Sequence, residues 1–204
     1  MRNQFLLAPD LVFLNHGSFG ACPREVLEVQ QRWQMEMERN PVEFLGRRSA
    51  GLLLQARTAL AQALGASADE LVFVPNSTTG VSVVARSFPL QPGDEVLTTD
   101  LEYGACDAAW QHVCAQAGAV YRRIKIPLPF DRESVTKHLL SAATRKTRLI
   151  TFSHITSSTA LIFPAAEICA AARERGIATF VDGAHAPGQI PVDLDAINAD
   201  FYVG

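Results

Sequence analysis

From about residue 66 onward, two hydrophobic periodicities alternate along the chain. Short, mostly apolar runs of the kind that form buried strands occur at 71–74, 95–99, 120–126, 147–154, 178–182 and from 201. Segments whose apolar residues recur every three or four positions predict helices at 81–88, 108–117, 132–143 and 164–175. Strands that alternate with helices are typical of a doubly wound α/β fold with a mainly parallel sheet, so we predict this fold class.

The first 65 residues follow a different pattern. A glycine-rich loop is expected at 11–23, and amphipathic helices are expected at 24–40 and 49–64. We therefore expect an N-terminal part made of a loop and helices at 1–65. A larger part at 66–204 should contain the six strands.

The loops that follow the strands carry most of the polar candidate residues. Right-handed crossovers place the carboxyl ends of all parallel strands at one edge of the sheet. The loops at 76–80, 100–106, 153–159 and 182–188 should therefore converge on one crevice. Open α/β sheets bind their ligands in such a crevice.

The segment TFVDGAHAPG, residues 179–188, is the first of these candidates. Its apolar run ends at Asp182, and His185 follows before a Pro-Gly break. An acid at the carboxyl end of a buried parallel strand lies where the crevice is expected. One alternative stays open, in which Asp182 only caps the next turn and His185 is a surface residue.

Ser77, Thr78 and Thr79 stand just before an expected helix. Free backbone amides and the helix dipole favour an anion there, which predicts a phosphate cradle. The loop has no Walker lysine, and no GxGxxG follows the first strand, so nothing supports a P-loop nucleotidase or a dinucleotide-binding dehydrogenase. Simple capping of the helix by Ser77 or Thr78 is the alternative.

Tyr103 supplies an aromatic face just past the second strand, although a partly buried structural tyrosine is an alternative. An anion cradle, an aromatic plate and a strand-end carboxylate fit a flat phosphorylated heteroaromatic with a ring nitrogen, as in pyridoxal 5'-phosphate. In such a site an ionised Asp182 would hold the pyridine nitrogen protonated. The ring could then accept electrons from a substrate carbon.

Composition narrows the remaining classes of function. The 204 residues carry 18 basic and 21 acidic side chains with both signs scattered, so we expect no nucleic-acid or membrane partner. No stretch reaches the roughly 18 apolar residues that a membrane helix needs, and the first residues do not form a signal-peptide pattern. The four cysteines form no CxxC pair and have no histidine at zinc spacing, which indicates reduced thiols, a cytoplasmic location and no metal site.

The motifs FLNHGSFGACP, NPVEF, NSTTGV, DLEYGAC, SHITSSTALIFP and VDGAHAPGQIPVDLDAINADFYVG together resemble the class V aminotransferase family. These are fold-type I pyridoxal phosphate enzymes, and the resemblance is strongest to the isopenicillin N epimerase-like branch. It runs from about Phe13 to Gly204, and its last motif is the most specific. It implies pyridoxal 5'-phosphate as the cofactor and the family's large domain as the fold.

The resemblance also implies roles for individual residues. The cofactor-binding residues would be Ser77, Thr78 and Thr79 at the phosphate, Tyr103 on the ring face, Asp182 at the pyridine nitrogen, and His185 and Ser157 near the phenolic oxygen. The substrate loop would be His16, Gly17 and Ser18. Ser158 departs from the family pattern, which usually has proline there.

The catalytic lysine of the family, which forms the Schiff base, is expected just after Gly204, and none of the lysines present fits that position. We therefore expect the N-terminal portion of a longer enzyme, with an incomplete large domain and no small C-terminal domain. In the family a later antiparallel strand lies beside the first strand, so the strand at 71–74 would be separated from its partners by a gap. The resemblance further implies a homodimer, in which Arg47 and Arg48 reach the site of the partner.

The function implied by the resemblance is a reaction at the α-carbon of an amino acid or amino-acid-like substrate, by epimerisation, elimination or transamination. A cysteine desulfurase or C–S lyase of the same family is one alternative, although Cys106 is expected to be a small buried hydrophobe. A metal-dependent hydrolase would use His154, Asp182 and His185. A non-catalytic remnant or partner protein is the last alternative, because the lysine is missing.

Overall fold

The computed structural model describes residues 2–204, apart from the side chain of Ser18. The chain forms two compact units, of which the first ends at Ala59 and the second spans Leu60–Gly204. The division falls inside a helix rather than after residue 65, where the pattern placed it.

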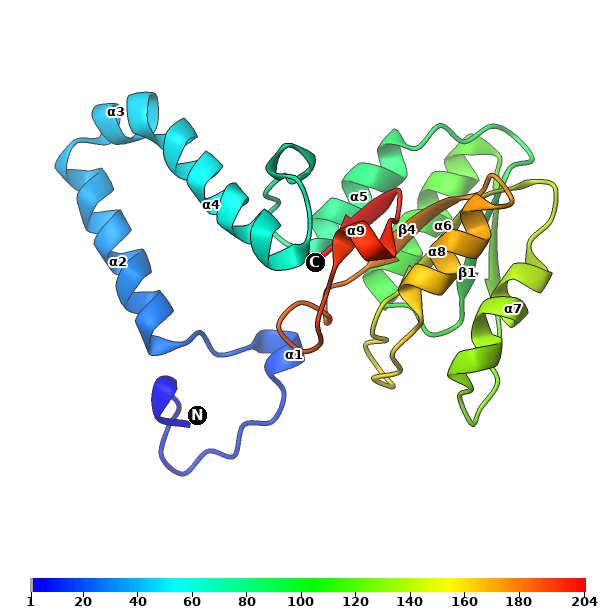
Figure 1. Ribbon diagram of the computed structural model, residues 1–204, viewed down its shortest axis with the longest axis horizontal. Helices are drawn as coiled ribbons and strands as arrows, with labels where there is room; N and C mark the ends of the chain where they lie inside the picture. The colour runs from blue at the N-terminus through cyan, green and yellow to red at the C-terminus, as the bar shows by residue number, and fades with distance from the viewer. Residues whose placement is uncertain (1) are drawn as a thin grey trace. The chain divides into compact units, whose positions relative to one another are not determined.

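The first unit is helical (Figure 1). Its elements are η1 (Arg2–Gln4), α1 (His16–Phe19), α2 (Arg24–Arg39), α3 (Pro41–Glu43), the π-helical turn η2 (Phe44–Arg48) and α4 (Ser49–Leu64), which continues into the second unit. Asn40 ends α2 and then caps α3, because its side chain accepts a hydrogen bond from the amide of Glu43 at 3.1 Å. The expected glycine-rich loop differs from the structure in one place, where residues 16–19 form the short helix α1.

The second unit is built on a five-stranded sheet in which every pair of neighbours is parallel. In the order β2-β1-β3-β4-β5, the strands are Val120–Ile124, Glu95–Thr99, Thr147–Ser153, Ala178–Asp182 and Phe201–Val203. The helices are η3 (Ala68–Glu70), α5 (Ser77–Ser87), α6 (Gly104–Ala117), α7 (Arg132–Ala142), α8 (Ala165–Arg173) and α9 (Leu194–Ile197). This arrangement confirms the doubly wound α/β class, and β2 lies at one edge of the sheet.

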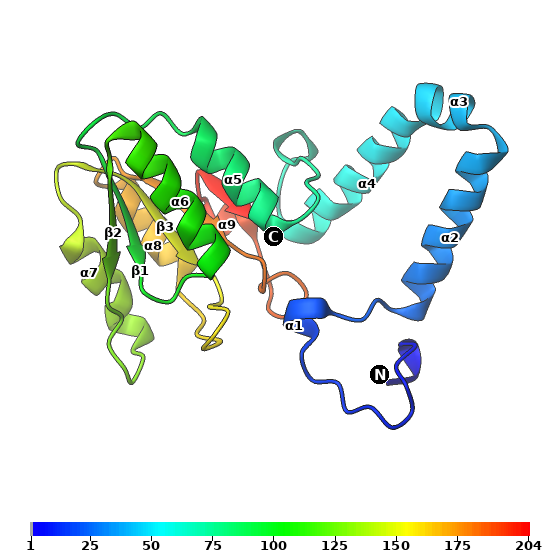
Figure 2. The ribbon, with the colours of Figure 1, turned by 180° about the vertical axis from the view of Figure 1, so that it is seen from behind.

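Helices cover both faces of the sheet. Successive strand residues point to opposite faces, so neighbours in sequence join different cores. Val96 and Phe180 pack with Trp110 in a cluster formed with α5 and α6. Their neighbours Leu97 and Val181 pack against α7 and α8. Figures 1 and 2 show the two covered faces from opposite sides.

Residues 71–74 do not form a strand, so that expectation is wrong, but the segment stays unpaired with the sheet, in agreement with the expected gap. Leu71 has extended backbone angles, but the segment pairs with none of the five strands of the described chain. Val72 is 78% exposed and Phe73 is 53% exposed, so these side chains lack the cover of a central strand. An apolar run supplies the side chains of a strand, but a strand also needs a neighbour to bond with.

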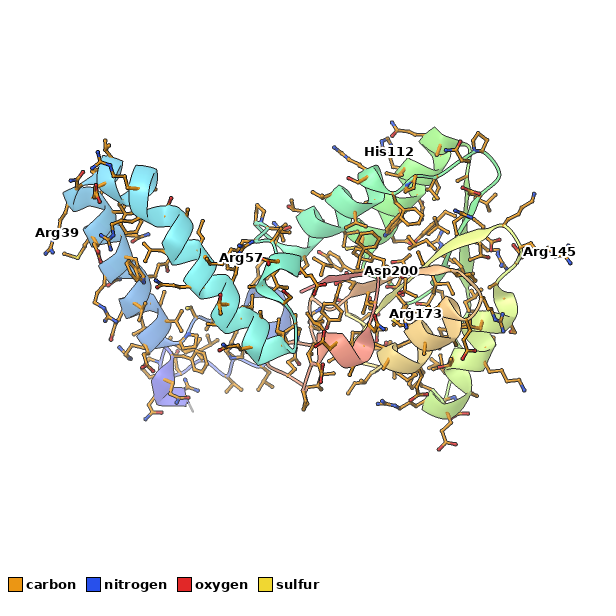
Figure 3. The ribbon with its side chains drawn as sticks, turned by 45° about the horizontal axis from the view of Figure 1, so that its top comes forward. Arg39, Arg57, His112, Arg145, Arg173 and Asp200 are labelled. Carbon is orange, nitrogen blue, oxygen red and sulfur yellow. The ribbon has the colours of Figure 1, made fainter. Side chains whose placement is uncertain are left out.

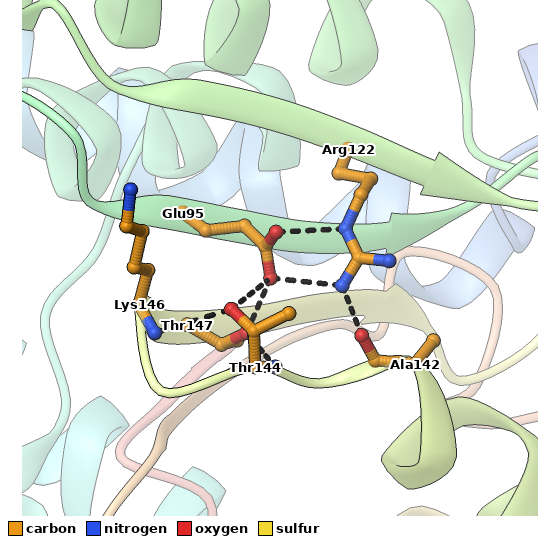
Figure 4. Close-up of polar contacts among 6 residues, drawn as sticks. All are labelled: Glu95, Arg122, Ala142, Thr144, Lys146 and Thr147. Carbon is orange, nitrogen blue, oxygen red and sulfur yellow. Dashed lines mark hydrogen bonds and ion pairs between the residues drawn. The ribbon is translucent and has the colours of Figure 1, made fainter.

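Two polar clusters fix the amino ends of the strands. Glu95 at the start of β1 forms a two-pronged ion pair with Arg122 of β2, with distances of 2.7 and 3.0 Å between nitrogen and oxygen (Figure 4). Thr147 of β3 donates its hydroxyl to the same carboxylate. Before β5, the carboxylate of Asp200 accepts a hydrogen bond from the amide of Thr179 on β4 at 2.7 Å, and Figure 3 labels Asp200.

The opposite, carboxyl edge of the sheet opens between β1 and β3. The chain goes from β1 outward to β2, then returns and adds β3, β4 and β5 on the other side, so the topology reverses between β1 and β3. The β1–β3 ladder ends at Leu97↔Ile150, before the last residues of either strand. A doubly wound sheet binds its ligand at such a point.

Candidate active site at the carboxyl edge of the sheet

Asp182 is the last residue of β4, and it is 7% exposed. Its Oδ1 accepts a hydrogen bond from the amide of Ala184 at 3.0 Å, and its Oδ2 accepts one from the thiol of Cys106 at 3.4 Å. Capping of the next turn therefore accounts for only one of the two oxygens. Each oxygen keeps a further acceptor position for a ligand.

His185 lies half-buried in the turn that follows, which is closed by a bond from the amide of Ala186 to the carbonyl of Gly183 at 2.8 Å. A Cβ at Gly183 would lie 2.2 Å from the ring of Tyr202, so a larger residue there requires that ring to move. The Tyr202 hydroxyl in turn lies 3.0 Å from Nδ1 of His154. The close approach of Gly183 to the Tyr202 ring, and the contact of Tyr202 with His154, thus position the loop after Asp182.

The helix α5 begins at Ser77, earlier than the hydrophobic period indicated, and Asn76 is its cap. The side-chain oxygen of Asn76 accepts hydrogen bonds from the amide and the hydroxyl of Thr79, at 2.9 and 3.1 Å. Capping by Ser77 or Thr78 is therefore wrong. In the described chain the amides of Ser77 and Thr78 have no acceptor, and they lie at the positive end of the helix dipole.

Tyr103 stands directly before α6, and half of it is exposed. Ser157 is exposed in the turn at 157–159, in a loop closed by the bridge between Ile155 and Ile162. The neighbouring Thr156 is buried, and its hydroxyl lies 2.7 Å from that of Thr159. The fold thus carries Tyr103 on the loop after β1, and Ser157 on the loop after β3.

The expected substrate residues belong to the other unit. His16 begins α1, and its ring centroid lies 5.2 Å from that of Phe5 and 4.7 Å from that of Phe13. Gly17 is exposed, and the side chain of Ser18 lies outside the described residues. Arg47 forms an ion pair with Glu43 at 2.7 Å, and Arg48 forms one with Glu36 at 2.6 Å.

Glu102 is a site residue that sequence reasoning missed. It receives hydrogen bonds from the hydroxyls of Thr99, at 2.5 Å, and Ser153, at 2.7 Å. Burial raises the pKa of Glu102 to about 7, the two hydrogen bonds oppose this shift, and the charge of Asp182 adds to it. The acid stands next to Tyr103 in sequence, and this was the signal that could have drawn attention to it.

Cys106 is buried, as expected, but it does more than fill space. Burial, together with the nearby charge of Asp182, raises the pKa of its thiol to about 12. The sulfur therefore keeps its proton near neutral pH and acts as a hydrogen-bond donor toward Asp182. Thiolate nucleophiles need the opposite shift, a lowered pKa.

A cavity of about 10 Å³ lies between the sheet and α6, and Glu102 and Asp182 both line it. The buried Thr98 hydroxyl and the Trp110 indole nitrogen also line it, and neither has a hydrogen-bond partner in the described structure. The metal-hydrolase alternative gains no support, because residues 2–204 contain no group of three or more His, Cys, Asp or Glu that could hold a metal ion. None of the described helices is long and apolar enough to cross a membrane.

Comparison with known proteins gives the same picture. The sequence model of the aminotransferase class V family matches residues 12–204. Isopenicillin N epimerase of Streptomyces clavuligerus is 41% identical over the whole of this chain and 51% of its own length. The putative L-cysteine desulfhydrase 1 of Oryza sativa subsp. japonica is 35% identical, over 93% of this chain and 42% of its own length.

A solved structure of a C-DES variant, with glycine covalently linked to its PLP cofactor, matches the whole chain and 54% of its own with a TM-score of 0.91 and 28% identity. The Escherichia coli cysteine desulfurase CsdA matches 98% of this chain and 52% of its own, with a TM-score of 0.81 and 26% identity. The chain spans about half the length of the curated relatives it matches. Family match, fold and crevice agree, and the chain belongs to the aminotransferase class V family.

Proposed function

We propose that this chain forms the pyridoxal 5'-phosphate site of an enzyme that acts on the α-carbon of an amino acid or amino-acid-like substrate, as an isopenicillin N epimerase-like protein. The observation that carries the proposal is Asp182, a buried strand-end carboxylate whose two oxygens are both oriented by protein donors. The names of the first relatives and the bound cofactor of the first structural neighbour support it.

The residues present fit this cofactor. The amides of Ser77 and Thr78 offer donors for a phosphate at the start of α5. Because Asn76 caps this helix, neither of their side chains serves as the cap. Tyr103 presents a half-exposed ring on the neighbouring loop. Asp182 keeps acceptor capacity for the proton of a ring nitrogen.

Pyridoxal 5'-phosphate bound here would supply an electron sink for the α-carbon of the substrate. Asp182 holds the proton on the ring nitrogen, because an ionised carboxylate favours the charged form of its partner. The Cys106 thiol and the Ala184 amide orient that carboxylate, and the first turn of α5 holds the phosphate. His185 and Ser157 are assigned to the phenolic oxygen, and His16, Gly17 and Ser18 to the substrate.

Cysteine C–S bond cleavage is the second candidate. It is favoured by the desulfhydrases among the relatives and by a cystine C–S lyase among the solved structures. Release of sulfide from cysteine by the full-length parent enzyme, with no change of configuration in isopenicillin N, would select this candidate. The chain as a non-catalytic partner is the third candidate, distinguished by full cofactor binding without turnover of either substrate.

The assembly we propose is a cytoplasmic homodimer. Many large hydrophobic side chains of the first unit are exposed, including Leu14, Phe19 and Leu45, and a second copy would cover them. The four cysteines are free, as expected of a reducing compartment. Light scattering of the full-length parent enzyme should give twice the monomer mass, and a monomer mass at every concentration would contradict the dimer.

The test of the cofactor site compares Asp182→Asn with Asp195→Asn, a control that removes an exposed acid of α9. Asp182→Asn should weaken binding of pyridoxal 5'-phosphate roughly 10- to 100-fold, because a charge-assisted hydrogen bond is lost. The ¹⁵N shift of the cofactor ring should also report loss of the ring proton. Equal affinity and equal ring protonation in both variants would refute the assignment of Asp182.

A further inference from the structure

Glu102 joins the two strands that separate at the site. It lies on the loop between β1 and α6, and its carboxyl group receives hydrogen bonds from Thr99, the last residue of β1, and Ser153, the last residue of β3. The backbone ladder between these strands has already ended at Leu97↔Ile150. One side chain therefore replaces the missing ladder bonds at the point where the topology reverses.

The same side chain lies beside Asp182. Ser153 is the register partner of Asp182 across β3 and β4, so the hydroxyl that bonds Glu102 comes from the residue next to Asp182 in the sheet. Both carboxyl groups line the small cavity under α6. Two carboxyl groups in one buried site do not both ionise readily, because each negative charge disfavours the other.

The other groups around the cavity do not supply a compensating charge. Cys106 and Asp107 face it from α6, and Tyr121 faces it from β2. The carboxylate of Asp107 is occupied by the hydroxyl of Tyr121 at 2.7 Å and by Arg123 at 3.1 Å. None of the described residues that line the cavity is a lysine or an arginine.

We infer that Glu102 is a positioning residue that ties β1 to β3 and is uncharged below neutral pH, while Asp182 carries the negative charge of the cofactor site. The inference rests on the proposed function for the part that concerns the cofactor. Burial and the nearby charge of Asp182 raise the pKa of Glu102 to about 7, against the two hydroxyl hydrogen bonds, which favour its charged form. The carboxyl group loses its proton as the pH rises through neutrality, and the site then gains a second negative charge.

Titration of the chain without cofactor tests the protonation state. In the chain labelled with ¹³C at the glutamate side-chain carboxyls, one resonance should titrate near pH 7, and it should vanish in Glu102→Gln. In Thr99→Val the same resonance should titrate at a higher pH, because one hydrogen bond to the charged form is gone. A spectrum in which every glutamate titrates near its ordinary pKa would overturn the inference.

Unfolding by urea gives a second readout on the same chain. A carboxyl group whose pKa is raised by folding stabilises the folded state below its unfolded pKa, and this contribution is lost as the pH rises through the folded value. As the pH rises from 5 to 8, the urea concentration at the unfolding midpoint should therefore decrease in the natural chain and in the exposed control Glu167→Gln. It should decrease less in Glu102→Gln. Parallel pH profiles for all three proteins would contradict a neutral Glu102.

Cofactor affinity tests the positioning role. Glu102→Ala removes the tie between β1 and β3 and should weaken binding of pyridoxal 5'-phosphate about tenfold, as expected for the loss of one or two hydrogen bonds. Glu102→Gln keeps groups that can bond Thr99 and Ser153, and it should rescue the affinity. Unchanged affinity in Glu102→Ala would overturn the role. Failure of the natural chain to bind the cofactor would instead refute the proposed function, while the two titrations still decide whether Glu102 is neutral.

Discussion

The thiol of Cys106 donates a hydrogen bond to Oδ2 of Asp182 at 3.4 Å, across 76 positions of sequence. The helix α6 thus reaches over the end of β4 and fixes one oxygen of its terminal carboxylate. Burial keeps the thiol protonated, so the contact is that of a donor and an acceptor rather than of two negative charges.

Removal of this donor should weaken the cofactor site without destroying it. Cys106→Ala should lower the affinity for pyridoxal 5'-phosphate about fivefold, because one hydrogen bond to a charged oxygen is lost. Cys106→Ser keeps a donor and should restore most of the affinity. Cys114→Ala is the matched control, since it removes another buried thiol from the same helix. Tryptophan fluorescence during cofactor titration measures all three, and equal affinities for Cys106→Ala and Cys114→Ala would contradict the role.

Substitutions at the start of α5 can distinguish a residue that stabilises the helix from residues that bind the phosphate. Asn76→Ala should lower the free energy of unfolding by about 1 kcal/mol, because the helix loses its cap. A double variant Ser77→Ala and Thr78→Ala leaves the cap intact and should unfold within about 0.5 kcal/mol of the natural chain. It should nevertheless bind inorganic phosphate and the cofactor more weakly, through loss of two hydroxyls. Urea unfolding and cofactor titration distinguish the two effects, and a double variant with full affinity would remove these hydroxyls from the site.

The ion pair at the amino ends of the strands should stabilise the fold and make it sensitive to acid. Burial alone would raise the pKa of Glu95, but hydrogen bonds from Arg122 and Thr147 and the positive charge of Arg122 lower it overall. A lowered folded pKa means that stability is present above pH 4.5 and is lost as the pH falls through the folded value.

Arg122→Ala should therefore lower the free energy of unfolding at pH 7 by roughly 1 to 3 kcal/mol. This is less than for a fully buried pair, because a third of the Arg122 side chain is exposed. The exposed Arg145→Ala serves as the control. A loss of stability that is the same at pH 3 and at pH 7 would contradict the ion pair as its cause.

Substitution by alanine at two different glycines should have opposite effects on stability. Gly183→Ala places a Cβ 2.2 Å from the Tyr202 ring, and we expect a loss of about 2 kcal/mol or more and displacement of the Asp182 turn. Gly51→Ala in α4 meets nothing within 4 Å and should stabilise that helix by about 0.5 to 1 kcal/mol. Thermal unfolding measures both, and a neutral Gly183→Ala would show that the Tyr202 ring can move aside.

The hydrophobic pattern predicted the class of fold because each strand of the sheet carries its own apolar run and each crossover its own helical period. It failed at 71–74, where the side chains suit a strand but the described chain offers no neighbour to bond with. Helix starts were placed too late at α5 and α6, since the residues of their first turns are polar or small. Apolar periodicity does not register such turns.

A site residue could be predicted only where a residue type suited to the chemistry stands at the end of a predicted strand. Asp182 follows an apolar run, and this position alone placed it at the carboxyl edge. Glu102 does not follow an apolar run in this way. Its role depends on interactions with Ser153 and Asp182, which lie far away in sequence. The same holds for Cys106, whose type and surroundings suggested packing alone.

Amide NMR of the chain during titration with pyridoxal 5'-phosphate can show whether the cofactor binds in the crevice around Asp182. The largest shifts should fall on the amides of Ser77, Thr78 and Ala184 and on the loop that holds Tyr103. Shifts should be small at His138, which lines a separate pocket beside α7. Binding that leaves the Asp182 loop and the start of α5 unperturbed, or no binding at all, would refute a cofactor site in this crevice.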